Sequence, residues 1–137
     1  MTDIVKIADC LYLGSLFATH PNNIKQHNIK HIISLGAQPC AGQVSSLFFD
    51  VSDNVHSVPV FQTHVLPSSY QFIKECIERG ENVLVHCAAG KSRSATVVIY
   101  YLMKRFGMSF DEAYRHVQDI RPEIGLNRGF VEMLRSV

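Results

Sequence analysis

The segment of residues 86–94, His-Cys-Ala-Ala-Gly-Lys-Ser-Arg-Ser, brings a thiol, two cations and hydroxyl groups close together in the chain. Cysteine reacts as the thiolate, and its pKa falls to roughly 3.5–7.5 at a helix N-terminus or beside a cation. Arg93 follows Cys87 in the same segment. Its planar guanidinium can hold two phosphate oxygens at once, which the point charge of Lys91 cannot do. This combination indicates a sulfur nucleophile placed beside a group that binds phosphate.

An apolar run lies on each side of this segment. Residues 82–87 predict a strand of the buried, parallel kind, and residues 94–107 predict an internal helix that is apolar on all sides and ends at Gly107. A loop between a strand and a helix presents unpaired backbone N–H groups and the positive end of the helix dipole. We therefore expect residues 88–93 to form a cradle for an oxyanion. The sequence lacks the earlier glycine of a nucleotide-binding P-loop, which argues against nucleotide binding.

Three further side chains of this segment are candidates for supporting roles. The hydroxyl of Ser94 can reach back to the sulfur and stabilise the thiolate when it leaves a phosphocysteine. His86 is expected to hydrogen-bond nearby backbone and fix the loop, because a thiolate that is already ionised needs no base. Lys91 is either a solvated cation or a substrate contact, and the sequence leaves both readings open.

The remaining elements alternate between strands and helices, which favours an α/β domain with a largely parallel central sheet. Strand patterns occupy residues 4–8, 11–14, 31–36 and 46–52, the last ending near Asp53. Helical spacing of apolar residues predicts helices over residues 66–80 and 110–120 and from about residue 127, and Ser109 with Glu112 forms a capping-box pattern. No clear period runs from Asp53 to His64, so we expect a loop there.

Composition bounds the class of protein. The chain has 137 residues, 47% of them hydrophobic and 18% charged, with a formal net charge of +1, which is typical of one globular domain. Global charge indicates neither nucleic acid nor an acidic membrane as a partner. We see no secretory leader, no apolar run long enough to span a bilayer and no C-x-x-C pair among the 4 cysteines. These features predict a soluble cytoplasmic protein with reduced thiols and no zinc site.

The segment of residues 86–94 resembles the His-Cys-x-x-Gly-x-x-Arg-Ser signature of cysteine-dependent protein phosphatases, specifically the dual-specificity branch. Residues 6–15, 83–114 and 121–134 resemble the opening strands, the signature with its following helices, and the closing segment of that family. The resemblance covers nearly the whole chain and implies that residues 1–137 are a dual-specificity phosphatase catalytic domain. It implies a sheet of about five strands flanked by helices, no metal or organic cofactor, a phosphoprotein substrate and a monomer.

The same resemblance assigns roles to individual residues. Cys87 would attack a phosphate that Arg93 holds together with the backbone amides of the loop, and Ser94 would assist the departing sulfur. The loop residues that would bind the phosphate are Ala88, Ala89, Gly90, Lys91, Ser92 and Arg93. Asn127 matches an asparagine that helps to hold the phosphate loop in the family, although Leu126 stands where relatives often have proline.

A general acid must protonate the oxygen that leaves, and a positioned carboxylic acid contributes roughly 10²–10⁴-fold to such a reaction. Asp53 lies on the predicted loop after a strand, where the resembling phosphatases carry this acid. Asp50 is the alternative, but it is expected further inside the strand as a structural or edge carboxylate. We favour Asp53. The residues from 54 to 67 contain no second acidic group where relatives often have one.

Three functions remain open on the sequence alone. The leading hypothesis is a small phosphatase that hydrolyses phosphotyrosine and phosphoserine or phosphothreonine through a phosphocysteine. A phosphate-reading adaptor without turnover is the second, and the presence of Cys87, Arg93 and Asp53 together argues against it. The third keeps the chemistry but acts on a phosphoinositide or an RNA 5′-triphosphate; Lys91 is the only lysine of the loop, which disfavours such highly charged substrates.

Overall fold

Five strands form one sheet at the centre of the computed structural model, which describes residues 3–40 and 44–137. The strands are β1 (Ile4–Ala8), β2 (Leu11–Gly14), β3 (Ile29–Leu35), β4 (Ser45–Phe49) and β5 (Asn82–His86). Their order across the sheet is β1-β2-β5-β3-β4, and only the β1–β2 pair is antiparallel. The expected mostly parallel sheet is confirmed, with the strand that leads to Cys87 in the middle.

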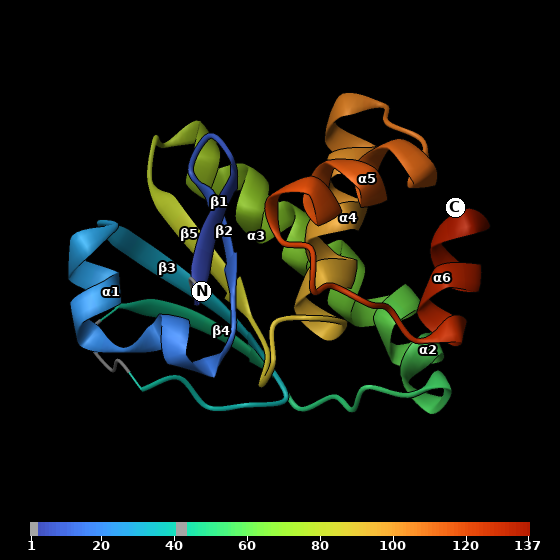
Figure 1. The fold of residues 1–137 in the computed structure, drawn as a ribbon, viewed down its shortest axis with the longest axis horizontal. Helices are drawn as coiled ribbons and strands as arrows, with labels where there is room; N and C mark the ends of the chain where they lie inside the picture. The colour runs from blue at the N-terminus through green and yellow to red at the C-terminus, as the bar shows by residue number, and fades with distance from the viewer. Residues whose placement is uncertain (1–2, 41–43) are drawn as a thin grey trace.

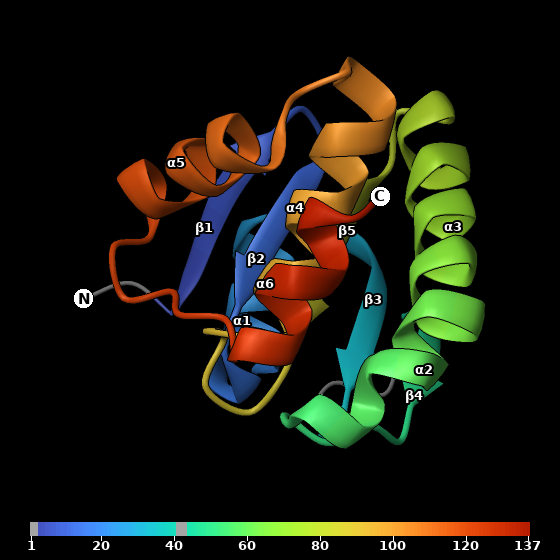
Figure 2. The ribbon, with the colours of Figure 1, turned by 90° about the vertical axis from the view of Figure 1, so that its right-hand side faces the viewer.

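Helices cover both faces of this sheet (Figure 1). The first short turn, η1 (Leu16–Thr19), and α1 (Pro21–Gln26) lie on one face. The other face carries α3 (Leu66–Glu78), α4 (Arg93–Phe106), α5 (Phe110–Ile120) and α6 (Arg128–Arg135), with α4 between α3 and α5 as Figure 2 shows. No helix in the described residues has the length and apolar character needed to cross a membrane.

The central strand separates two hydrophobic cores. Val83 and Val85 of β5 face the larger core under α3–α6, whereas Leu84 faces the smaller core under α1. Successive side chains of a strand point to opposite faces, so a continuously apolar strand can supply both cores. This burial on two sides is the reason that the run at residues 82–87 is apolar throughout and holds its carboxyl end in a fixed place.

The internal helix is α4, and it begins at Arg93, one residue before the predicted segment. Its residues 94–99 are all buried. The helix ends at Gly107, whose φ of 69° is left-handed and suits glycine. The predicted capping box is present at the start of α5, where Ser109 and Glu112 exchange side-chain to backbone hydrogen bonds. These outcomes confirm the helix boundaries that the sequence indicates on either side of residue 107.

The prediction of a loop from Asp53 to His64 is wrong. This stretch contains three short helical turns, η2 (Val55–Ser57), α2 (Val58–Val60) and η3 (Phe61–Val65), which lead directly into α3. Asn54 caps the first turn by accepting a hydrogen bond from the N–H of His56 at 2.9 Å. The turns differ in hydrogen-bond spacing, so they show no single 3.6-residue period. The ring of Phe61 packs on that of Phe130 at 4.4 Å between centroids and fixes the stretch against α6.

The strand predicted over residues 46–52 is also shorter than expected. Pairing with β3 stops at the Leu35–Phe49 pair, and the N–H of Val51 turns back to the carbonyl of Phe49 at 3.1 Å. The carbonyl of Val51 accepts a hydrogen bond from Arg93 instead of from a strand. Residues 50–54 therefore leave the sheet early and contact the segment that follows β5.

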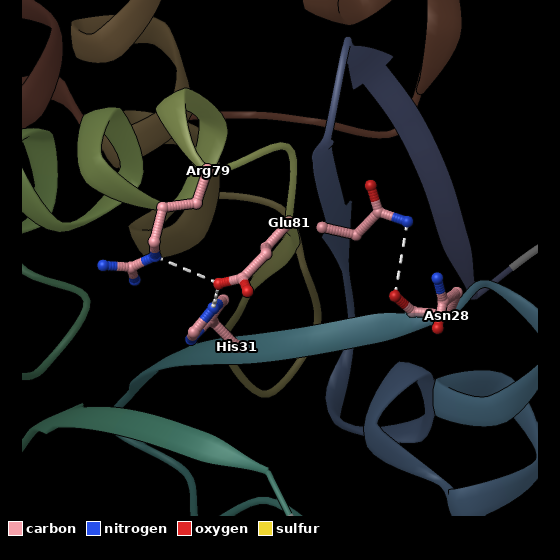
Figure 3. A network of polar contacts seen from close by, with 5 residues as sticks. Asn28, His31, Arg79 and Glu81 are labelled. Carbon is pink, nitrogen blue, oxygen red and sulfur yellow. Dashed lines mark hydrogen bonds and ion pairs between the residues drawn. The ribbon is translucent and has the colours of Figure 1, made fainter.

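A polar network at the opposite end of the sheet joins α3 to β3 (Figure 3). Oε1 of Glu81 accepts hydrogen bonds from Nε2 of His31 at 2.7 Å and from Nε of Arg79 at 3.1 Å. The hydrogen bond from His31, followed by that from Arg79, lowers the pKa of the Glu81 carboxyl. The side-chain amide of Asn82 donates to the carbonyl of Asn28 at 3.3 Å beside it. These contacts lie at the amino ends of β3 and β5, away from Cys87.

Candidate active site

The loop between β5 and α4 lies at the carboxyl end of the central strand, where the chain also leaves β3 and β4 (Figure 1, Figure 2). Cys87 follows β5 directly and is buried, with 2% of its surface exposed. Arg93 opens α4, so the loop of residues 88–92 stands over the N-terminus of a 14-residue helix. We call residues 88–93 the phosphate loop. Its place is the one expected for an anion at the positive end of a helix dipole.

The sulfur of Cys87 is surrounded by groups that favour its ionised form. Burial opposes a charge on the sulfur, but it is outweighed by hydrogen bonds from the side chain and backbone of Ser94, the backbone of Gly90 and the charge of Arg93. Together they hold the pKa of the Cys87 thiol below its ordinary value. Sγ of Cys87 and Oγ of Ser94 lie 3.1 Å apart. The contact expected between these two side chains is therefore present.

Each backbone carbonyl from Cys87 to Lys91 accepts a hydrogen bond on the outer side of the loop. The donors are His86 Nδ1 to Cys87 at 3.2 Å, Leu16 N–H to Ala88 at 3.0 Å, Arg121 Nη2 to Ala89 at 3.2 Å, Arg121 Nε to Gly90 at 2.8 Å, and Gly125 N–H to Lys91 at 3.0 Å. In a planar trans peptide the C=O of one residue and the N–H of the next point in opposite directions. The N–H groups of residues 88–92 are therefore turned to the inner side.

Gly90 is required at its position in this loop. Its φ is 68°, in the left-handed region, and a Cβ atom there would come within 2.6 Å of the Gly14 carbonyl and 2.8 Å of Nη2 of Arg121. Any other residue would both strain the backbone and push the loop away from its donors. The glycine of the sequence pattern is thus explained by the turn and by the close approach of two neighbours.

His86 is a neutral ring that holds the carbonyl of Cys87, the residue before the phosphate loop. Its Nδ1–H donates to the Cys87 carbonyl, so its Nε2 is the acceptor for the hydroxyl of Ser34 at 2.7 Å. Burial lowers the pKa of His86 to about 4, with a smaller contribution from the charge of Arg93. The ring is therefore uncharged near neutral pH, and the expected contact between its side chain and the nearby backbone is present.

A backbone carbonyl holds one nitrogen of the Arg93 guanidinium, and another nitrogen has no protein partner within the described residues. Nη1 of Arg93 donates to the Val51 carbonyl at 3.0 Å, while Nε is buried and has no hydrogen-bond partner within the described part of the chain. A Cβ at Gly36 would collide with the guanidinium, and Gly36 has a left-handed φ of 73°. The glycine that follows β3 thus leaves room for the side chain of Arg93. This orients the guanidinium and leaves N–H donors for an anion.

Asp53 accepts two hydrogen bonds, one from Ser92 of the phosphate loop and one from Asn127. Its Oδ1 accepts from Oγ of Ser92 at 2.7 Å and from Nδ2 of Asn127 at 2.8 Å. The Asn127 N–H also donates to Oγ of Ser92 at 3.3 Å, and Oδ1 of Asn127 caps α6 by accepting from the Phe130 N–H at 2.9 Å. Both contacts to Asp53 use Oδ1, and Oδ2 accepts no hydrogen bond within residues 3–40 and 44–137. The structure brings Asp53, Ser92 and Asn127 together.

Asp50 and Lys91 lie outside this set of contacts. Asp50 is exposed and follows the last residue of β4 instead of lying within the strand, so the expectation of an in-strand carboxylate is wrong. No hydrogen bond links Asp50 to the phosphate loop within residues 3–40 and 44–137, whereas Asp53 has one to Ser92. The side chain of Lys91 is exposed, while its carbonyl is held by Gly125.

Sequence reasoning missed the residues that hold the phosphate loop from behind. Leu16 and Gly125 do so through backbone N–H groups, which carry no side-chain signal. Arg121 is a third such residue, which is 4% exposed and donates to two carbonyls of the loop. A long cation beside proline at the end of a helix is a weak signal, because many such residues are solvated.

Comparison with known proteins agrees with this fold and site. Residues 11–137 match the family model described as dual specificity phosphatase, catalytic domain. Dual specificity protein phosphatase 1 of Arabidopsis thaliana is 34% identical over 128 residues, which are 93% of this chain and 65% of that protein. A probable dual specificity protein phosphatase of Dictyostelium discoideum is 36% identical over 139 residues, which are 99% of this chain and 34% of that protein.

Solved structures agree as well. The crystal structure of human tyrosine phosphatase-like serine/threonine/tyrosine-interacting protein matches with a TM-score of 0.86 at 33% identity, over 97% of this chain and 93% of that one. The chain therefore belongs to the dual-specificity phosphatase family, whose matched domain is a hydrolase catalytic domain. It spans 65% and 34% of the lengths of the two curated relatives named above.

Proposed function

We propose that this chain is a protein phosphatase that hydrolyses phosphotyrosine and phosphoserine or phosphothreonine through a phosphocysteine at Cys87. The observation that carries the proposal is the convergence of a thiol of lowered pKa, inward-facing amides and Arg93 on one point at a helix N-terminus. Such an arrangement binds the phosphate dianion and its charged transition state by preorganised donors. Membership of the family supports the same chemistry.

In the first step the Cys87 thiolate attacks phosphorus while the loop amides and Arg93 hold the phosphate oxygens. An S–P bond forms and the P–O bond to the substrate breaks. Asp53 gives the proton on Oδ2 to the departing oxygen. The hydrogen bonds from Ser92 and Asn127 to Oδ1 support this role, because they hold the carboxyl group against the loop that binds the phosphate.

In the second step water attacks phosphorus, and Asp53, now a carboxylate, takes a proton from that water. The S–P bond breaks, and its electron pair returns to sulfur as the Cys87 thiolate. The hydroxyl of Ser94, 3.1 Å from the sulfur, stabilises that thiolate as it leaves. Inorganic phosphate is released, and the enzyme returns to its initial state without a cofactor taking part in either step.

A substrate panel tests the proposal. The wild-type chain and a Cys87→Ser variant are assayed under reducing conditions with an aryl phosphate and with peptides that carry phosphotyrosine, phosphoserine or phosphothreonine. We expect the wild type to release phosphate from the aryl ester and the peptides, and the variant to bind the peptides without turnover. Binding without turnover by the wild type would instead make the chain a phosphate-reading adaptor. Turnover confined to phosphoinositides or to RNA 5′-triphosphates would contradict the assignment of substrate.

A further inference from the structure

Arg121 is a buried arginine behind the phosphate loop whose hydrogen bonds reach two consecutive carbonyls of that loop. Its Nε donates to Gly90 at 2.8 Å and its Nη2 donates to Ala89 at 3.2 Å. The donors of a guanidinium form a rigid, planar fork. A single side chain thus fixes the orientation of two adjoining peptide groups relative to one another, which a flexible lysine with one ammonium group cannot do.

Local sequence explains why Arg121 points at the loop. Proline restricts the residue before it to extended backbone, and Arg121, which precedes Pro122, has φ −130° and ψ 85°. Its N–H still bonds to the Val117 carbonyl at 2.8 Å, so Arg121 caps the end of α5. This capping residue leaves the helical path, and its side chain reaches the phosphate loop.

The chain from Arg121 onward runs alongside the phosphate loop. Arg121 holds the carbonyls of Ala89 and Gly90, the N–H of Gly125 holds the carbonyl of Lys91, and the N–H of Asn127 reaches Oγ of Ser92. Residues 121–127 thus contact residues 89–92 in the same order along both segments. Of the contacts just named, the two from Arg121 are made by a side chain to backbone carbonyls.

We propose that Arg121 is a positioning residue of the phosphate site, which turns the N–H groups of Gly90 and Lys91 toward the bound phosphate by holding the carbonyls of Ala89 and Gly90. The inference rests on the proposed function, since it concerns the same loop. Arg121 acts by fixing peptide geometry, because a trans peptide whose carbonyl is held outward must present its N–H inward. The close approach between Gly90 and Arg121 leaves little room for the peptide group to rotate back.

A second consequence concerns the nucleophile. The backbone N–H of Gly90 is one of the hydrogen-bond donors to the Cys87 sulfur. The peptide group that presents this N–H is the one whose carbonyl, on Ala89, is held by Arg121. Release of that carbonyl would therefore weaken both the binding of an oxyanion and the ionisation of the sulfur. A residue that served only to fill space would not affect these two properties together.

The test uses Arg121→Met, which keeps most of the side-chain volume but removes the donors, and Arg121→Lys, which keeps the charge but not the fork. Arg115→Met is the matched control, because Arg115 is exposed on α5, the helix that Arg121 caps. Affinity for inorganic phosphate and for tungstate is measured by calorimetry, and the pH dependence of Cys87 alkylation is followed by mass spectrometry. Thermal unfolding reports whether each variant folds.

We expect Arg121→Met to weaken oxyanion binding by about tenfold or more, which is the size of effect expected for losing a hydrogen bond from a charged group, and to shift Cys87 alkylation to higher pH. Arg121→Lys should fall between it and the wild type, and Arg115→Met should match the wild type. If Arg121→Met does not fold, Arg121→Lys is read against the same criteria. A folded variant with wild-type oxyanion affinity and alkylation profile would overturn the inference. Failure of the proposed function is seen separately, as absence of turnover by the wild type.

Discussion

The sulfur of Cys87 and the hydroxyl oxygen of Ser94 lie 3.1 Å apart, although Cys87 directly follows β5 and Ser94 lies in the first turn of α4. The loop between these elements folds back, so that the residue after the loop contacts the residue before it. A nucleophile and the group that stabilises it as a leaving group are thus positioned by one strand–loop–helix unit.

Replacement of Ser94 by alanine should raise the pKa of Cys87 and slow the breakdown of the phosphocysteine. A hydrogen bond to a charged group contributes roughly 1.5–3 kcal/mol, so the second step should slow by about ten- to a hundredfold. Stopped-flow assays would show a burst of leaving group followed by a slow steady rate. Ser136→Ala, at the end of α6, serves as the control. Equal steady rates for the two variants would remove Ser94 from the mechanism.

Replacement of Asp53 by alanine should slow hydrolysis by about 10²–10⁴-fold for substrates with poor leaving groups, because the departing oxygen then lacks its proton. Aryl phosphates with good leaving groups should be affected much less. A series of aryl and alkyl phosphates of graded leaving-group pKa measures this directly. Asp50→Ala is the matched control on the same loop. If Asp50→Ala produced the steeper dependence, the assignment of the acid would be wrong.

The neutral ring of His86 makes the fold sensitive to acid. The unfolded chain binds a proton at His86 near pH 6.5, whereas burial lowers the pKa in the folded protein to about 4. Between these values the unfolded state binds more protons, so the free energy of unfolding falls as the pH falls through this window. The full shift corresponds to about 3 kcal/mol. Urea titrations at pH 7 and pH 4 should show a smaller difference for His86→Gln than for the wild type. An equal pH dependence would contradict the neutral, buried assignment.

The thiols of Cys76 and Cys87 should differ strongly in reactivity although both are buried. Burial raises the pKa of Cys76 to about 11, while the hydrogen bonds around Cys87 lower its pKa in spite of burial. The thiolate is the reactive form. Brief treatment with iodoacetamide at pH 7 should therefore alkylate Cys87 first, as peptide mapping of the native protein would reveal. Preferential labelling of Cys76 would contradict the opposite shifts of the two thiol pKa values.

Much of the fold was predictable because its elements are specified locally. The continuously apolar strand β5, the Ser109–Glu112 capping box and the glycine at residue 107 each follow from a short stretch of sequence. The turns between Asp53 and His64 were not predictable in this way, since they mix hydrogen-bond spacings and depend on the packing of Phe61 against Phe130. Periodicity reveals only those elements whose apolar residues recur at one fixed spacing.

In the candidate site, too, the relationships that could be predicted are those between residues close together in sequence. Cys87, Arg93 and Ser94 lie close together in sequence, and so their relationship could be read from spacing. Asp53 and Asn127 were placed by resemblance to a family, and their meeting at Ser92 is a long-range contact. The supports of the loop carbonyls are mostly backbone groups from distant segments, which only the folded chain brings together.

In the proposed mechanism the phosphoryl group passes through the sulfur of Cys87. Acid quenching of the Ser94→Ala variant during turnover of a phosphotyrosine peptide, followed by mass spectrometry of its proteolytic fragments, tests it most directly. We expect one phosphoryl group on the fragment that contains Cys87, appearing within the burst and absent from Cys87→Ser. Turnover without that modified fragment, or the same modification in Cys87→Ser, would contradict it.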